Sequence, residues 1–108
     1  IINFSAFAVK IGLQGESVYV ASKAGVEGFT RSIARELAPL NVTVNCISAG
    51  PIKTKLTNKV PVSYIEKIIQ QQIINKQCDK EDILKCVKLI LSEDSSKITG
   101  ENFIIGGY

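Results

Sequence analysis

The chain has 108 residues, of which 45% are hydrophobic and 21% are charged, and its formal net charge is +3. These values are typical of a globular domain, or of part of a larger one, and not of a disordered segment. The lysines are interleaved with acidic residues and form no basic stripe, which argues against a nucleic-acid partner. No apolar run approaches the roughly 20 residues that a helix needs to span a bilayer, so we expect no membrane partner.

The cysteines and the absence of histidine bear on metals and on the cell compartment. Cys46, Cys78 and Cys86 have no Cys-x-x-Cys spacing, and the sequence contains no histidine, so we expect no metal site. An odd number of cysteines without a secretory signal favours a reducing compartment, which predicts a cytoplasmic protein. The sequence also lacks methionine and opens in an apolar segment, which predicts a piece of a longer protein.

The first half of the sequence predicts a strand, a long helix and a second strand. Residues 1–6 are short, apolar and rich in branched side chains, as in a buried strand, and residues 8–16 follow as a glycine-containing loop. From residue 17 to residue 38 the apolar period is helical. The apolar stripe of this helix is Val18, Val26, Phe29, Ile33 and Leu37. Residues 41–48 alternate between apolar and polar side chains and predict the second strand.

The second half predicts two more helices and a last strand. The S-x-x-E sequence at residues 63–66 has the form of a capping box, so a helix is expected from residue 64 to residue 73 or 74. Asp79 is expected to cap a helix over residues 80–91, and residues 101–105 to form the last strand. The order β-α-β-α-α-β predicts an α/β fold with a parallel sheet covered on both faces, whose first strand has an unpaired edge.

Tyr19 and Lys23 are the first candidates for a chemical role. Four residues apart on a helix, they project from one face, one turn apart. A nearby ammonium favours the phenolate, so we expect Lys23 to lower the pKa of Tyr19 and to make it a general acid and base near neutral pH. The alternative is an ordinary surface pair, because the Y-x-x-x-K spacing alone is common.

Four segments around this pair resemble the short-chain dehydrogenase/reductase family, in particular members that reduce 3-oxoacyl-carrier-protein thioesters. They are IINFSA, YVASKAGVEGFTRSIARELAPLNVTVN, SAGPIKTKLT and ITGENFIIGGY. The resemblance covers essentially the whole chain. It implies that residues 1–108 are a partial NAD(P)-binding domain: the C-terminal part of a Rossmann-like doubly wound parallel sheet, with the N-terminal half absent.

The resemblance also implies a mechanism and a cofactor. Tyr19 would be the general acid in carbonyl reduction and the general base in alcohol oxidation. Lys23 would lower the pKa of Tyr19 and hydrogen-bond the ribose hydroxyls of NAD or NADP. The cofactor carries the hydride, while the protein supplies position and electrostatics.

The loop after the second strand would form one wall of the nicotinamide site. By the same resemblance, the backbone around Gly50, Pro51 and Ile52 would touch the carboxamide, and Thr54 would add a hydroxyl nearby. Residues 56–74 would be the substrate lid. The implied substrate is a small carbonyl compound or alcohol, including an acyl thioester, and the implied assembly is a homo-oligomer, a dimer or a tetramer.

The sequence departs from the family pattern at three places. Ala6 stands where the family has its carbonyl-polarising serine, and Ser5 is one residue short, so its hydroxyl would point to the other face of the strand unless the backbone bulges. Ala49 replaces a proline, and we expect the loop path to survive. The glycine-rich phosphate-binding turn is not present, so we expect no useful cofactor affinity for these 108 residues alone.

Two functions remain open on this evidence. One is the catalytic part of an NAD(P)-dependent reductase, and the other is a pseudo-enzyme or an oligomerisation remnant of the same fold. The departure at Ala6 fits a weakened reductase, a member that has lost activity, or a sequence altered on purpose at this position.

Overall fold

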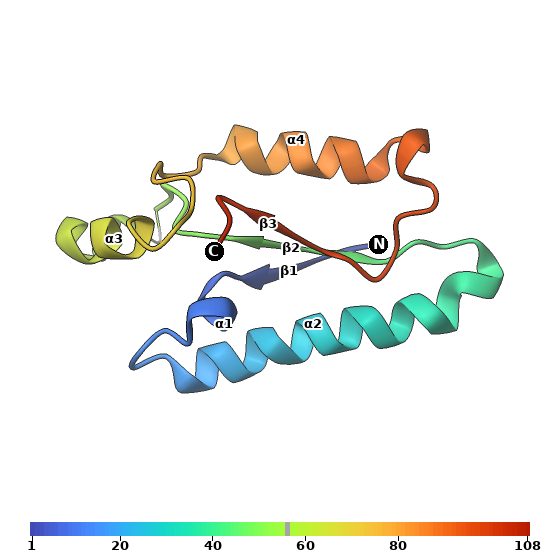
Figure 1. Cartoon of the computed structure of the whole chain (residues 1–108), viewed down its shortest axis with the longest axis horizontal. Coiled ribbons are helices and arrows are strands. Elements are labelled where there is room, and N and C mark those ends of the chain that lie inside the picture. Colours follow the sequence, from blue (N-terminus) through green and yellow to red (C-terminus); the bar gives the residue numbers. More distant parts are fainter. Residues whose placement is uncertain (56) are drawn as a thin grey trace.

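A three-stranded parallel sheet forms the centre of the molecule. The computed structural model describes residues 1–55 and 57–108; Leu56, part of the predicted loop and lid, lies outside them. The strands are β1 (Ile2–Ala6), β2 (Asn45–Ala49) and β3 (Asn102–Ile105), in the order β1-β2-β3. In Figure 1, α2 (Ser17–Leu37) covers one face of the sheet and α4 (Lys80–Leu91) covers the other. The predicted α/β fold with a doubly covered parallel sheet is confirmed.

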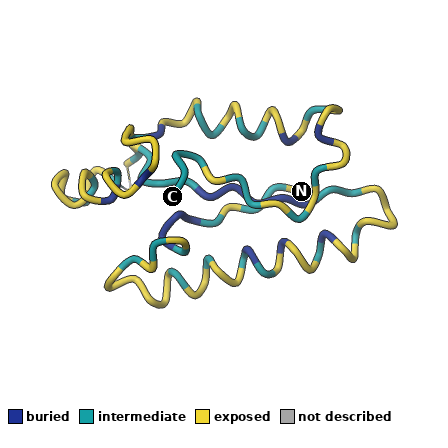
Figure 2. Tube along the Cα trace, in the orientation of Figure 1, coloured by how far each residue is buried: buried dark blue, intermediate teal, exposed yellow. Residues whose placement is uncertain are grey.

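The central strand β2 is buried along almost its whole length, as Figure 2 shows for the middle of the sheet. Residues 44–48 are buried irrespective of polarity, because helices cover both faces. The predicted strand over residues 41–48 begins too early. Asn41 has a left-handed backbone (φ 56°) and ends a 3-10 turn at Ala38–Leu40, so the chain is still turning there.

Helix α2 ends within one residue of its predicted end, but its buried face differs from the predicted apolar stripe. The buried residues are Glu27, Thr30 and Ala34, whereas Val18 is 83% exposed and Phe29 57% exposed. Apolar periodicity in the sequence predicts which face of a helix is apolar. It does not identify the strand or helix against which that face packs. Two of the three buried residues, Glu27 and Thr30, form hydrogen bonds with polar side chains of the sheet.

The structure corrects two local predictions. The predicted loop after β1 contains a short helix, α1 (Ala8–Ile11), which ends at Gly12 with φ 60°. Helix α3 (Val62–Ile69) begins after Pro61, so Ser63 lies inside the helix and the predicted capping box is wrong. Proline at the start of a helix needs no backbone donor, because the first amides have no partner within the helix.

Helix α4 has the predicted bounds and the predicted cap. The Asp79 carboxylate accepts hydrogen bonds from the backbone amides of Glu81 (2.8 Å) and Asp82 (3.0 Å), and Asp82 accepts one from the amide of Asp79 (3.0 Å). This reciprocal arrangement is a capping box. None of the helices in the described part of the chain is long and apolar enough to cross a membrane.

The C-terminal residues fold back over the carboxyl end of the sheet. Gly106 and Gly107 have positive φ angles, and their carbonyls accept hydrogen bonds from the amides of Ile74 (2.9 Å) and Ile73 (3.2 Å). A Cβ at Gly106 would overlap the side chain of Gln72. The ring of Tyr108 then stacks on Phe7, with 4.7 Å between the centroids. The tail therefore connects the ends of β1 and β3 to the segment after α3.

Candidate active site

Two cavities meet at Tyr19, beside the carboxyl end of the sheet. The first, of about 320 Å³, lies at the end of β1 and along the loop that follows β2. Its lining includes seven residues that the sequence singled out: Ser5, Ala6, Tyr19, Gly50, Pro51, Ile52 and Thr54. The second, of about 290 Å³, is mostly apolar and shares Tyr19 and Pro51 with the first. Its other walls come from residues 13–16, residues 57–60 and α3. Open α/β sheets bind ligands at this edge.

Lys23 lies one helical turn from Tyr19, as the spacing predicts, but it does not line either cavity. Its Nζ is 5.9 Å from the centroid of the Tyr19 ring and donates a hydrogen bond to the carbonyl of Phe4 (3.0 Å). An ammonium has three N–H donors, so two remain available for other acceptors. The pair is therefore assembled, with the ammonium held at the edge of β1.

The pKa of Tyr19 does not follow the sequence prediction. Burial of the phenol raises the pKa above its ordinary value, and the negative charge of Glu16 raises it further. The predicted lowering by Lys23 is therefore not found in this chain. A raised pKa keeps the phenol protonated at neutral pH, which is the form that donates a proton to a carbonyl oxygen.

Replacing Glu16 by glutamine is expected to lower the pKa of Tyr19, because the nearby negative charge that opposes phenolate formation is removed. The change should be smaller than the whole shift, since burial is its larger cause. An NMR titration of the tyrosine ring carbons would measure it, with Glu66→Gln as the control. An unchanged pKa of Tyr19 in Glu16→Gln would contradict the assigned contribution of Glu16.

Ser5 and Ala6 occupy opposite faces of β1. The Oγ of Ser5 lies 2.9 Å from Oε1 of Glu27 and 3.1 Å from the carbonyl oxygen of Lys23, both on α2. A hydroxyl has one hydrogen, and both neighbours are acceptors, so this hydrogen goes to α2. The pairing of β1 with β2 is continuous up to Ala6 and Ala49, without the bulge that would turn Ser5 towards a substrate.

Ala6 is buried and contributes only a methyl group to the first cavity. The position that the resemblance assigns to the carbonyl-polarising donor therefore has no hydroxyl.

The loop after β2 is held by threonine hydroxyls and by the C-terminal tail. Oγ1 of Thr57 accepts a hydrogen bond from the amide of Thr54 (2.8 Å) and donates one to the carbonyl of Ile52 (2.8 Å). Behind the loop, a Cβ at Gly50 would come within 2.8 Å of the Tyr108 hydroxyl. Glycine thus lets the tail approach the loop backbone closely. Thr57 and Tyr108 were not among the predicted site residues, although the T-x-x-T spacing of Thr54 and Thr57 is typical of a hydroxyl-bonded turn.

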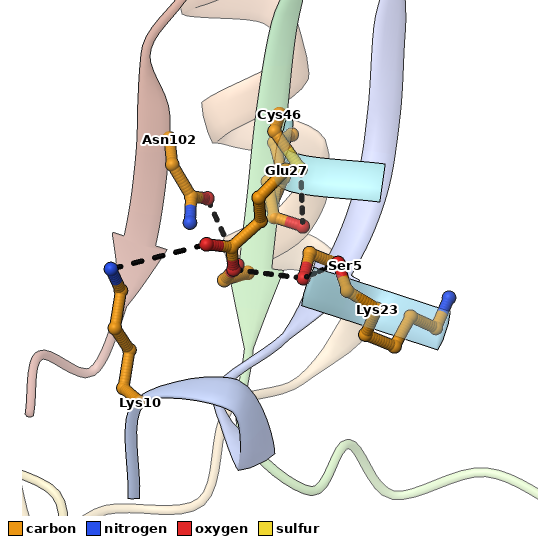
Figure 3. A network of polar contacts seen from close by, with 8 residues as sticks. Ser5, Lys10, Lys23, Glu27, Cys46 and Asn102 are labelled. Carbon is orange, nitrogen blue, oxygen red and sulfur yellow. Dashed lines mark hydrogen bonds and ion pairs between the residues drawn. The ribbon is translucent and has the colours of Figure 1, made fainter. Parts of the chain in front are cut away.

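A polar network behind the site, drawn in Figure 3, was also missed. Glu27 on α2 points towards the sheet between Ser5, Lys10 and the strand β2. Its only sequence signal was its spacing of four residues after Lys23, which places both on one helix face. The described residues contain no group of three or more acidic, cysteine or histidine side chains placed to hold a metal ion. The three cysteines are free thiols.

The fold and the position of the cavities define an α/β protein with a ligand crevice at the carboxyl ends of parallel strands. A family model described as Enoyl-(Acyl carrier protein) reductase matches residues 1–108. The chain therefore belongs to the short-chain dehydrogenase/reductase family, whose resemblance the sequence had suggested.

Individual relatives agree with this assignment. The (3R)-3-hydroxyacyl-CoA dehydrogenase of Homo sapiens is 39% identical over 107 residues, which cover 99% of this chain and 41% of the relative. The 3-oxoacyl-(acyl-carrier-protein) reductase of Pseudomonas aeruginosa is 34% identical over 107 residues, which cover 99% of this chain and 43% of that relative. The structure of a 4-hydroxyisoleucine dehydrogenase complexed with NADH superposes with a TM-score of 0.88 at 32% identity, covering 99% of this chain and 45% of that one. The chain thus spans less than half the length of these relatives.

Proposed function

We propose that this chain supplies the catalytic part of an NAD(P)-dependent oxidoreductase that reduces a carbonyl group or oxidises an alcohol. The observation that carries the proposal is the position of Tyr19, where the two cavities meet, with Lys23 one turn away on the same helix. In reduction the Tyr19 hydroxyl donates its proton to the substrate oxygen, and in oxidation the phenolate accepts it. A phenol of ordinary pKa is protonated at neutral pH, and burial raises the pKa of Tyr19 further, so the proton-donating form predominates.

The first cavity fits the nicotinamide end of NAD or NADP, which supplies or accepts the hydride when bound. The Gly50–Ile52 backbone forms one wall, where it can meet the carboxamide, and Thr54 lines the same wall. The two N–H groups of Lys23 that have no hydrogen-bond partner among the described residues are donors for the ribose hydroxyls. The residues do not provide a phosphate-binding glycine turn, so the adenine and pyrophosphate portions need a segment outside these 108 residues.

The second cavity suits the apolar portion of a small substrate. Its walls include Leu13, Val60, Ile65 and Ile68, and it opens onto Tyr19. Apolar pockets with few polar groups typically hold the non-reacting part of a ligand. We propose a carbonyl compound or alcohol with an apolar chain, including an acyl thioester, the class of compound in the names of the human and Pseudomonas relatives.

A homo-oligomer, a dimer or a tetramer, and a cytoplasmic location complete the proposal. Exposed apolar side chains lie on the outer faces of both long helices, such as Val18 and Phe29 on α2 and Leu89 and Leu91 on α4. Exposed apolar side chains on two long helices favour association. The free state of the three cysteines agrees with a reducing compartment.

A pseudo-enzyme or an oligomerisation remnant is the second candidate. The observation that favours it is the missing donor: Ala6 has no hydroxyl, and the Ser5 hydroxyl is directed to Glu27 and Lys23. Such a chain would keep the fold and the association surfaces without turnover.

The cofactor proposal is tested by NMR with fragments of the dinucleotide. Nicotinamide mononucleotide, NADH and NADPH at millimolar concentration should shift the backbone signals of Tyr19, Lys23 and residues 50–54 in the isotope-labelled chain. Adenosine monophosphate, the control, should leave these signals in place, because the adenine site is not among these residues. Micromolar affinity for NADH would contradict the expected need for a phosphate-binding turn. Unchanged signals with nicotinamide mononucleotide would favour the remnant.

A further inference from the structure

Glu27 is a buried carboxylate that the proposed reaction does not use. It is 6% exposed and lies in the middle of the α2 face that packs on the sheet. Removing a carboxylate from water is unfavourable unless hydrogen bonds and a countercharge compensate for it. A side chain in this place therefore has partners that hold it there.

These partners come from three other elements. Oε1 of Glu27 is 2.9 Å from Oγ of Ser5 on β1 and 3.4 Å from Oγ of Ser48 on β2, and Oε2 is 3.9 Å from Nζ of Lys10 on α1. The Lys10 side chain is 44% exposed, so its ion pair is long and screened by solvent. The Ser5 contact is the shortest of the three and is partly buried. It is the contact that fixes the position of the carboxylate.

Ser5 and the residue before it join β1 to Lys23 at two points. The Ser5 hydroxyl lies between Oε1 of Glu27 and the carbonyl oxygen of Lys23, which is 3.1 Å away. The adjacent carbonyl, that of Phe4, accepts a hydrogen bond from Nζ of Lys23 (3.0 Å). Figure 3 shows Glu27 and Lys23 from the same helix on either side of Ser5. Displacing Ser5 from α2 would move the Phe4 carbonyl as well, because the two residues share a peptide bond.

We propose that Glu27 is a positioning residue for Lys23. Its carboxylate holds the Ser5 hydroxyl against α2, and this places the Phe4 carbonyl where it receives the Lys23 ammonium. The catalytic meaning of this role rests on the proposed function, in which Lys23 serves the cofactor. The role itself is a property of the chain and requires no cofactor. It also gives Ser5 a task other than polarising a substrate carbonyl.

The test measures the rate at which an acetylating reagent modifies Lys23, relative to the exposed Lys88 on α4, by mass spectrometry. Glu27→Leu and Ser5→Ala should each speed the modification of Lys23 by roughly fivefold, about the factor that one hydrogen bond of ordinary net strength represents. Glu27→Gln keeps an oxygen that can accept from Ser5, so its Lys23 should react at nearly the wild-type rate. Glu36→Gln, a carboxylate change on the exposed face of α2, is the matched control.

The conservative variant separates positioning from a general effect of charge or stability. If Glu27→Gln accelerated Lys23 modification as much as Glu27→Leu, the hydrogen-bonded role would be overturned. An unchanged rate of Lys23 modification in Ser5→Ala would overturn the hydrogen-bonded role as well. If circular dichroism shows that Glu27→Leu does not fold, the Ser5→Ala rate alone tests the proposal. Because no nucleotide is added, the outcome is independent of the nicotinamide mononucleotide titration, and either proposal can fail while the other stands.

Discussion

Replacing Tyr19 by phenylalanine is expected to reduce hydride transfer by roughly 10² to 10⁴-fold, the usual contribution of a positioned general acid or base. The substitution removes the only hydroxyl of that side chain, which lies where the two cavities meet. The assay uses a fusion of this chain to the part of the human (3R)-3-hydroxyacyl-CoA dehydrogenase that it does not cover, and follows the absorbance of the reduced cofactor.

The matched control for this experiment is Ser22→Ala. Its hydroxyl is exposed on the same helix and bonds only the carbonyl of Tyr19 within the described residues, so its loss should change the rate by less than about threefold, in line with surface substitutions. Cofactor binding and circular dichroism would establish that both variants fold. A Tyr19→Phe enzyme that kept more than a tenth of the rate would remove Tyr19 from the chemical step.

Replacing Ala6 by serine is expected to raise the rate of the same fusion by roughly 10² to 10³-fold, the usual contribution of one donor to a developing negative charge. Ala6 lines the first cavity together with Ser5 and Tyr19, but its side chain lies on the face of β1 opposite to the Ser5 side chain. A hydroxyl at this position would not donate a hydrogen bond to Glu27, so it would be available to polarise a substrate carbonyl. The measurement is kcat with a 3-oxoacyl thioester.

Ala34→Ser provides the control, because Ala34 is equally buried but lies on α2 away from both cavities. It should leave kcat unchanged while placing a comparable polar group in the interior. A gain confined to Ala6→Ser would identify the chain as a weakened reductase. No gain, in a fusion that binds cofactor and still depends on Tyr19, would mean that the carbonyl is polarised by another group.

The order of the strands and of the three longer helices was predictable from the sequence, whereas the short helix α1 was not. Asp79 caps α4 with side-chain hydrogen bonds to amides two and three residues away. All the groups that form this cap therefore lie within four consecutive residues and can be identified from the sequence. The start of β2 was not predictable from the sequence. The left-handed backbone of Asn41 continues the turn after α2, so the strand begins later in the chain than predicted. The S-x-x-E sequence at Ser63 failed because Pro61 starts the helix two residues earlier.

The sequence predicted which residues come together at the candidate site, but not the direction of the pKa shift of Tyr19. Chain order brings Tyr19, Ala6 and the Gly50–Thr54 loop to one edge of the sheet, as the motifs implied. The direction of the pKa shift depends mainly on burial of the phenol, which only the tertiary structure determines, and to a smaller degree on Glu16, three residues earlier in the chain. Glu27 was missed for the same reason. Periodicity assigns a charged residue to the surface, whereas the hydroxyls of two distant strands and the ammonium of Lys10 compensate for the burial of Glu27.

The parallel sheet also determines how the chain reaches its folded state. Ile2 pairs with Asn45, and Cys46 pairs with Asn102, so every pairing joins residues more than forty positions apart. Such distant pairings must overcome the entropy of loop closure, which slows folding, whereas α2 forms from neighbours in sequence. We therefore expect the sheet to close last. Until it does, the apolar strands are available to other chains, and that interval is when this protein is most prone to aggregate.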